Sequence, residues 1–157
     1  MEGKTVKETS TIMVEPMTPQ DANVAGNVFG GAIMKLIDAV AGIVARRHAG
    51  GNVVTASIDR LDFHHPVFIE DVLTLKASPN LVGRTSMEVG VHAESENLDT
   101  GEIRHTASAY LTLVALDTDG KPRVVPPLIL ETEEEVRRNR DAQLRREMRL
   151  RERKKKM

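Results

Sequence analysis

Asp38 is the residue whose type and position point most directly to chemistry. It lies in the middle of segment 32–48, which is apolar except for Lys35, Asp38 and three basic residues at its end. Most residues three, four or seven positions away are small, which leaves room beside the carboxylate for a ligand or another backbone. A carboxylate held against apolar surface is a stronger base, suited to taking a proton from water. A salt bridge to Lys35, three residues away, is the structural alternative.

Gly30 and Gly31 stand just before this segment and are candidates for binding developing negative charge. Glycines at a helix N-terminus leave backbone N–H groups open, and the helix dipole favours an oxyanion from an ester or thioester there. Gly30 lies eight residues before Asp38, or about 12 Å along a helix. One carbonyl therefore cannot reach both groups of one helix, so the substrate extends along the helix or two chains share each site.

The elements that position these residues follow from the periodicity of apolar residues. Segment 32–48 is apolar on nearly all sides, which predicts a buried helix, and Gly50 and Gly51 end it. A strand is predicted before it at 9–15. After the helix the period changes to two, which predicts long strands at 54–63, 73–77, 86–94 and 103–116. The alternation changes phase around Asp59 and Arg60, which indicates a β-bulge.

This order predicts an α+β fold, in which a curved antiparallel sheet wraps around one long central helix. Tyr110, Val114 and Leu116 occupy the second face of the last strand, so we expect that face to be covered as well. Residues 8–120 are predicted to form the domain, and 121–157 a Pro-containing linker and a charged C-terminal helix. Thr132 and Glu135 form a capping box for that helix. Its apolar residues are few, so we interpret it as a solvated helix, with docking or phosphate contact as the alternative.

Composition and charge exclude several classes of protein. The chain has 157 residues with no Cys and no Trp, which excludes disulfide scaffolds and thiol catalysis and disfavours base stacking. Net charge is −1, and the basic end (net +4 over 131–157) brings no stacking residues, so we expect no nucleic-acid partner. We expect no metal, since the adjacent His64 and His65 of a strand face opposite ways. The N-terminus has no apolar signal region and no run is long enough for a membrane span, so we expect a cytoplasmic protein without membrane contact.

The sequence resembles the hotdog-fold acyl-CoA thioesterases in the motif from Asn23 to Asp38, NVAGNVFGGAIMKLID. It is most similar to the cytosolic long-chain (brain-type) acyl-CoA hydrolases and their single-hotdog bacterial relatives. The resemblance continues through VVTASIDRLDF, GRTSMEV and VALDTDGKPRVVP and covers roughly residues 9–150. It implies a hotdog fold and hydrolysis of fatty acyl-CoA to free fatty acid and CoA. It also implies no cofactor, since coenzyme A is part of the substrate.

The resemblance assigns roles to individual residues. Asp38 of one hotdog activates water or attacks the thioester itself, and it works with Asn23 of the paired hotdog. Gly30 or Gly31 polarises the carbonyl, and Thr55 orients the water or the carboxylate. Because this chain carries one hotdog, we expect a homo-oligomer of paired hotdogs, and the family suggests a hexamer built as a trimer of dimers.

The resemblance also places a CoA-binding segment after Gly83. Arg84, Thr85 and Ser86 form a cluster of donors there, and for Arg84 a solvated turn is the alternative. Further candidates for binding the CoA phosphates are Arg46, Arg47 and Arg123.

Two rival functions use the same fold. A non-catalytic acyl-CoA sensor would need an output module, and only 131–157 is available for one. A hotdog dehydratase would need a His–carboxylate pair, and no His lies near Phe29 and the glycines in the sequence.

Overall fold

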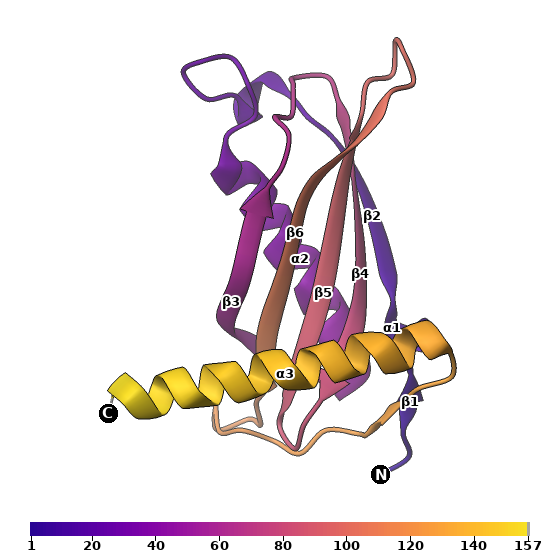
Figure 1. Ribbon diagram of the computed structural model, residues 1–157, viewed down its shortest axis with the longest axis vertical. Helices are drawn as coiled ribbons and strands as arrows, with labels where there is room; N and C mark the ends of the chain where they lie inside the picture. The colour runs from indigo at the N-terminus through magenta and orange to yellow at the C-terminus, as the bar shows by residue number, and fades with distance from the viewer. Residues whose placement is uncertain (157) are drawn as a thin grey trace.

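The structure, a computed structural model, describes residues 1–156 and is built on a five-stranded antiparallel sheet (Figure 1). The sheet has the order β2-β4-β5-β6-β3. Its strands are β2 (Thr11–Pro16), β3 (Val53–Phe63), β4 (Val72–Val82), β5 (Ser86–Glu96) and β6 (Ile103–Ala115). The predicted α+β hotdog architecture is therefore confirmed. The order differs from simple succession, because segment 64–71 carries the chain from β3 at one edge to β4 beyond β5 and β6.

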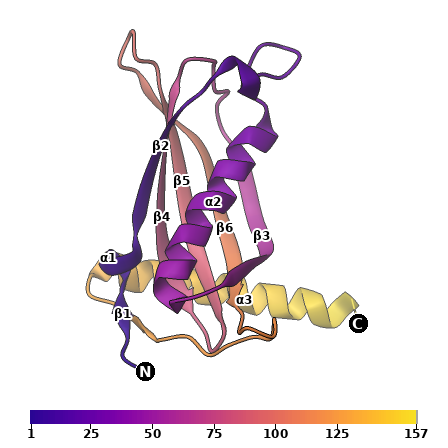
Figure 2. The same ribbon diagram turned by 180° about the vertical axis from the view of Figure 1, so that it is seen from behind.

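Helix α2 (Gly30–Ala49) lies along one face of the sheet (Figure 2). Val40, Ala41 and Val44 are fully buried against the strands and form the centre of the core. The helix ends at Gly50, whose φ of 74° is a left-handed conformation that glycine adopts without strain. The predicted helix is confirmed, and it is longer than expected by the two glycines at its start.

Strand β3 forms one edge of the sheet and contains two irregularities. The pairing with β6 shifts between Asp59 and Asp62, where Arg60 has a φ of 52°, so the predicted bulge is confirmed. A second, unexpected shift lies between Thr55 and Ser57. Residues an odd number of positions apart normally face opposite sides of a strand. Because of this shift, Thr55 and Ile58 instead face the same side, where they pair with Leu113 and Leu111. Both therefore point toward α2.

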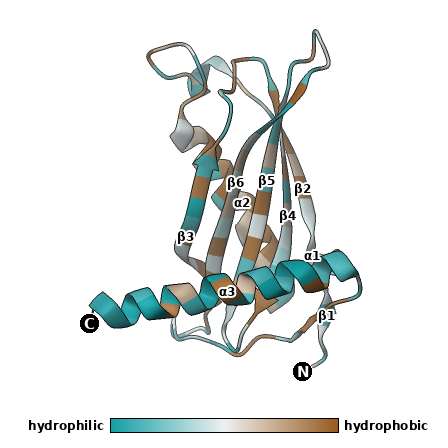
Figure 3. Cartoon of the chain, in the orientation of Figure 1, coloured by the Kyte–Doolittle hydropathy of each residue, from teal (hydrophilic) through white to brown (hydrophobic). Residues whose placement is uncertain are grey.

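Helix α3 (Glu133–Lys156) crosses the outer face of the sheet, on the side opposite α2 (Figures 1 and 2). Thr132 Oγ1 accepts a hydrogen bond of 3.1 Å from Glu135 N, as the capping motif predicted. Figure 3 shows that the helix is mostly hydrophilic, yet it is not simply solvated. Ala142 is fully buried and Arg145 binds the buried Glu88 of β5, so the docking alternative holds.

The remaining elements lie near the two ends of the chain and in the loop before α2. They are β1 (Lys4–Thr5), α1 (Val6–Thr9), the 3-10 turn η1 (Pro19–Asp21) and β7 (Leu128–Ile129). Strands β1 and β7 pair in parallel, and Val125 is buried in the core. The segment after residue 120 thus packs against the core and against β1. The domain boundary at residue 120 stays a prediction.

Candidate active site

Asp38 and Thr55 meet between α2 and β3. Thr55 Oγ1 donates a hydrogen bond of 2.7 Å to Asp38 Oδ1. The shift in β3 makes this contact possible, because it turns Thr55 toward the helix. No ion pair joins Asp38 to Lys35 among residues 1–156, so the structural alternative is not formed. The hydroxyl fixes one carboxylate oxygen and leaves the other free to accept a proton.

Asp38 is exposed in the single chain, and the expected burial is wrong. The same stripe of α2 exposes Met34 and Lys35, whereas Val40 and Val44 on its other sides are buried. The reason is the position of β3, which is the edge strand on this side of the sheet that the described residues form. The carboxylate is therefore open to water, to a ligand or to a second copy.

Asn23 is held by the loop that precedes α2. Its Oδ1 accepts hydrogen bonds from Ala25 N at 2.9 Å and Asn27 N at 3.1 Å. Its side-chain nitrogen has no hydrogen-bond partner among residues 1–156, and no hydrogen bond links Asn23 to Asp38 there. The loop thus fixes the orientation of the side-chain amide, with its NH₂ free to donate outward.

Gly30 and Gly31 occupy the first two positions of α2. The N-cap residue, Phe29, supplies no side-chain hydrogen bond, so the two glycine amides remain open donors within the described chain. A Cβ on Gly31 would lie 2.6 Å from the Phe29 ring, so only glycine allows this close approach. A Cβ on Gly30 would lie 3.5 Å from the ring of Phe63. These amides can stabilise an oxyanion, as expected from the sequence.

The candidate CoA-binding residues fall into two groups. Arg84 and Thr85 lie in the turn between β4 and β5, Ser86 is the first residue of β5, and Arg84 is exposed. Arg46, two turns beyond Asp38 on α2, is also exposed. Neither Arg84 nor Arg46 has a side-chain hydrogen bond or ion pair among residues 1–156, so both guanidinium groups can bind an anion.

Arg47 and Arg123 have structural partners instead. Arg47 Nη1 donates to Thr11 Oγ1 at 2.9 Å, on the side of β2. Arg123 Nη1 donates to Ala49 O at 3.0 Å and so satisfies a free carbonyl at the end of α2. Arg123 Nη2 is buried without a partner, close to Gly51. The predicted role of these two residues at phosphates therefore gains no support from their geometry.

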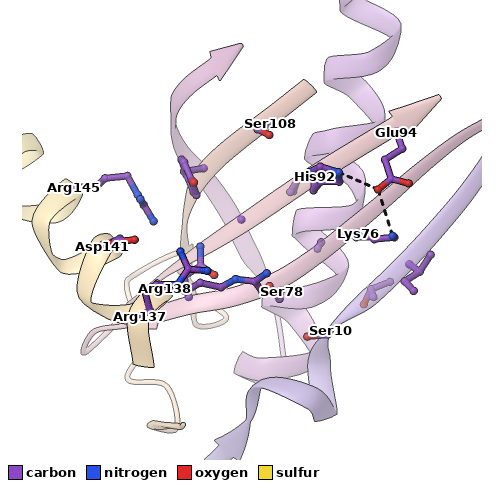
Figure 4. Close-up of a pocket in the computed structure, with 17 residues that line it drawn as sticks. Ser10, Lys76, Ser78, His92, Glu94, Ser108, Arg137, Arg138, Asp141 and Arg145 are labelled. Atoms are coloured by element: carbon purple, nitrogen blue, oxygen red, sulfur yellow. Dashed lines mark hydrogen bonds and ion pairs between the residues drawn. The ribbon is translucent and has the colours of Figure 1, made fainter. Parts of the chain in front are cut away.

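A cavity of about 720 Å³ lies on the outer face of the sheet, between α3 and strands β2, β4, β5 and β6 (Figure 4). Arg137, Arg138 and Arg145 of α3 line it, as does Lys76 of β4. Lys76 Nζ lies 3.4 Å from Glu94 Oε1. The sheet separates this cavity from Asp38, so it is not part of the candidate site. This cavity could not be predicted from the sequence, because it depends on the docking of α3.

Two kinds of feature are absent from residues 1–156. No group of three or more His, Asp or Glu side chains could hold a metal ion. Within the same residues, no helix combines the length and the apolar character that a membrane span requires.

The chain matches known proteins along most of its length. The model of the thioesterase superfamily matches residues 25–102. The "Uncharacterized acyl-CoA thioester hydrolase YkhA" of Bacillus subtilis is 42% identical over 130 residues, which are 83% of this chain and 76% of that protein. The "Cytosolic acyl coenzyme A thioester hydrolase" of Mus musculus is 39% identical over 87% of this chain and 36% of that protein.

Solved structures agree over nearly the whole chain. An apo-hexameric acyl-CoA thioesterase is 41% identical with a TM-score of 0.93, and the alignment covers 97% of each chain. An acyl-CoA hydrolase of Staphylococcus aureus, in complex with butyryl-CoA and CoA, is 37% identical with a TM-score of 0.89, covering 98% of this chain and 93% of that one. Variants of that hydrolase with one Asp, one Asn or one Thr replaced by Ala also match. This chain belongs to the acyl-CoA thioester hydrolases of the thioesterase superfamily.

Proposed function

We propose that this chain hydrolyses acyl-CoA thioesters to free fatty acid and CoA at a site that two copies build together. The hydrogen bond from Thr55 to Asp38 carries the proposal. It fixes the carboxylate at the open edge of the sheet and leaves one oxygen to take a proton from water. The site agrees with the S. aureus hydrolase, in which the altered Asn, Asp and Thr are separated by 15 and 17 residues, as are Asn23, Asp38 and Thr55.

The reaction follows from the groups available. Asp38 removes a proton from water, and the resulting hydroxide attacks the thioester carbonyl carbon. Negative charge develops on the carbonyl oxygen, where the amides of Gly30 or Gly31 of the second copy and the positive end of its α2 dipole stabilise it. Collapse of the intermediate breaks the C–S bond. The CoA thiolate leaves and recovers the proton from Asp38.

The free edge of β3 is the surface on which we propose that a second copy binds. The strand is paired on one side only, and its apolar Val54, Ile58 and Phe63 are exposed. Antiparallel pairing of two β3 strands would satisfy the free backbone groups of both edges. The side-chain amide of Asn23 from the second copy then positions water or substrate beside Asp38, which resolves the distance between Gly30 and Asp38 on one helix. The hexameric relative supports assembly as a trimer of such dimers.

The CoA moiety would bind at the end of the molecule where α2 ends. We propose that Arg84, with Thr85 and Ser86, and Arg46 contact its phosphates, because both guanidinium groups are exposed and uncommitted. No cofactor takes part in the proposed steps. The cytosolic relative of mouse supports a cytoplasmic location.

Replacing Asp38 tests the proposal. The Asp38→Asn variant should lower kcat by about 10²- to 10⁴-fold, because the amide cannot accept the proton from water. Release of thiol is followed with a panel from acetyl- to palmitoyl-CoA, and isothermal titration with CoA checks that the variant still binds. Lys35→Gln, an exposed neighbour on the same helix, is the matched control and should keep full activity. Unchanged turnover in folded Asp38→Asn would contradict the assignment, and tight binding without hydrolysis by the native chain would favour the sensor alternative.

A further inference from the structure

The C-terminal part of α3 extends beyond the sheet. Figures 1 and 2 both show the helix crossing the strands and continuing past β3 to a projecting end. Its last polar contact with the sheet joins Arg149 Nη1 to Asp59 Oδ2 at 2.7 Å. Residues 150–156 make no side-chain hydrogen bond or ion pair with the rest of the described chain, although the helix continues to Lys156. This end of the helix is therefore unpartnered within one copy.

Leu144 and Met148 form an apolar pair on this otherwise charged helix. Their exposed fractions are 56% and 60%, and their spacing of four residues places them on one side. Arg146 lies 3.4 Å from the Cβ position of Gly83, in the turn between β4 and β5, and marks the other side of the helix. Asp141 and Arg145 line the cavity (Figure 4). Leu144 and Met148 lie three positions after these two residues, so they lie on the side of α3 that faces the cavity.

The cavity side of α3 faces the C-terminal half of the free β3 edge. The helix crosses the sheet near the turn between β4 and β5, so the part of β3 from Asp59 to Phe63 lies on the cavity side. A second copy paired antiparallel at β3, as proposed above, is related to the first by a twofold axis through that edge. The two copies then contact each other through the same surface. Its α3 lies on the same outer face and runs in the opposite direction. With the axis in this part of the edge, the apolar pairs of the two helices would face each other across it.

Charge favours the same arrangement. The projecting end carries five cationic residues and Glu152; the cationic ones are Arg151, Arg153, Lys154, Lys155 and Lys156. The outer face of β3 carries Asp62, whose ion-pair partner in its own copy is Arg60 at 3.8 Å, with both side chains more than half exposed. Antiparallel pairing would place the second copy's β3 beneath the projecting end, where the exposed carboxylate of its Asp62 could bind these cations.

From these observations we infer that α3 is a dimer clamp: Leu144 and Met148 pack against the α3 of a second copy, and residues 151–156 bind the outer face of its β3. The inference rests on the β3-paired dimer of the proposed function, and it adds an interface on the face of the sheet opposite the catalytic residues. It also explains why a helix with few contacts to its own chain persists to Lys156.

Cysteine cross-linking tests the clamp directly, because the native chain has no Cys. Met148→Cys should give a covalent dimer in high yield with a short bis-maleimide, since residues near a twofold axis lie near their own copies. Val136→Cys is the matched control, an exposed apolar position on the same helix far from the β3 edge, and it should stay uncross-linked. Changing Leu144 and Met148 together to Glu should weaken the dimer about tenfold or more, because apolar burial is replaced by charge repulsion.

The outcomes separate this inference from the proposed function. A multimeric, active enzyme that fails to cross-link at Met148, and whose assembly tolerates both Glu substitutions, overturns the clamp alone. A native chain that is a single copy in solution overturns the clamp and the shared site together. Cross-linking at Met148 with an unreactive Val136→Cys supports the clamp whether or not the enzyme hydrolyses the thioester tested.

Discussion

At the scale of the residue, the Asp38 carboxylate illustrates how a neighbouring hydroxyl defines a functional geometry. The hydrogen bond from Thr55 restrains rotation of the carboxylate and leaves its second oxygen without a hydrogen bond among the described residues. The nearest basic residue on the helix, Lys35, forms no ion pair with it, so the base is not neutralised by its own chain. A water molecule held between Asp38 and a second copy would thus meet a base that is already oriented.

His48 predicts how stability depends on pH. Its side chain is fully buried, Nε2 lies 2.6 Å from Pro126 O, and Nδ1 is buried without a partner. Burial, reinforced by the positive charge of Lys4, lowers the pKa of His48 below its ordinary value of 6.5, against the opposing effects of the Pro126 carbonyl and Glu8. The unfolded state therefore binds a proton more readily than the folded state. The stabilisation is complete above pH 6.5 and is lost as the pH falls from there toward the folded pKa.

We accordingly expect the free energy of unfolding to decrease as the pH falls below about 6.5. The His48→Gln variant should show a flatter profile, because it removes the group whose pKa changes on folding. Urea unfolding at a series of pH values gives the measurement, with the exposed His65→Gln as control. Part of the slope should remain, since burial also lowers the pKa of His105. An identical slope in His48→Gln and the native chain would rule His48 out as its source.

At the scale of the element, the attachment of α3 depends on one buried carboxylate. The Glu88 side chain is 1% exposed and accepts hydrogen bonds from Arg145 Nε at 2.9 Å and Nη2 at 2.8 Å. Asn80 Nδ2 donates a third at 3.1 Å. Arg145 also stacks 3.6 Å above the ring of Tyr110, which covers the second face of β6 as the sequence predicted. Arg145 thus supplies the closest countercharge of Glu88 and covers an aromatic ring, while Arg149 Nη1 lies 3.7 Å from Glu88 Oε1.

Removing that arginine should loosen the helix. Arg145→Ala is expected to reduce the free energy of unfolding by about 3 kcal/mol, because the buried Glu88 then keeps only its longer contact of 3.7 Å with Arg149 Nη1. Arg138→Ala breaks an exposed pair with Glu134 on the same helix and should cost less than about 1 kcal/mol. Replacing Glu88 by Leu and Arg145 by Met together should be less harmful than Arg145→Ala alone. Denaturant unfolding at constant protein concentration measures all of these, and equal losses for Arg145→Ala and Arg138→Ala would contradict this account of the contact.

The elements themselves were largely predictable, because local periodicity reports which side chains are buried. The helix at 32–48, the long strands and the bulge near Asp59 all follow from it. Their neighbours in space were not predictable in the same way. The exposure of Asp38 depends on β3 being an edge strand, and Arg145 meets Glu88 across 57 positions of sequence. The apolar residues on the second face of β6 were a local indication that another element, here α3, packs on that face.

At the scale of the whole molecule, one copy holds an incomplete site. Asp38, Thr55 and the open amides of Gly30 and Gly31 line α2 and β3, while Asn23 lies in the preceding loop without a hydrogen bond to Asp38. The sequence motif predicts which residues take part, because their types and spacing are local, and these roles stay predictions. It could not place the residues relative to one another, since in the proposed site that arrangement depends on a second chain at the β3 edge.

Mixing two inactive variants tests the shared site most directly. Asn23→Ala and Asp38→Ala should each lose most thioesterase activity, because every site in either homo-oligomer lacks one group. When the two variants are unfolded together and reassembled in equal amounts, half of the dimers formed are mixed, and one of the two sites in each mixed dimer has both groups. The account predicts recovery of about a quarter of the native activity. No recovery in verified mixed oligomers would contradict it and place Asn23 and Asp38 in the same copy's site.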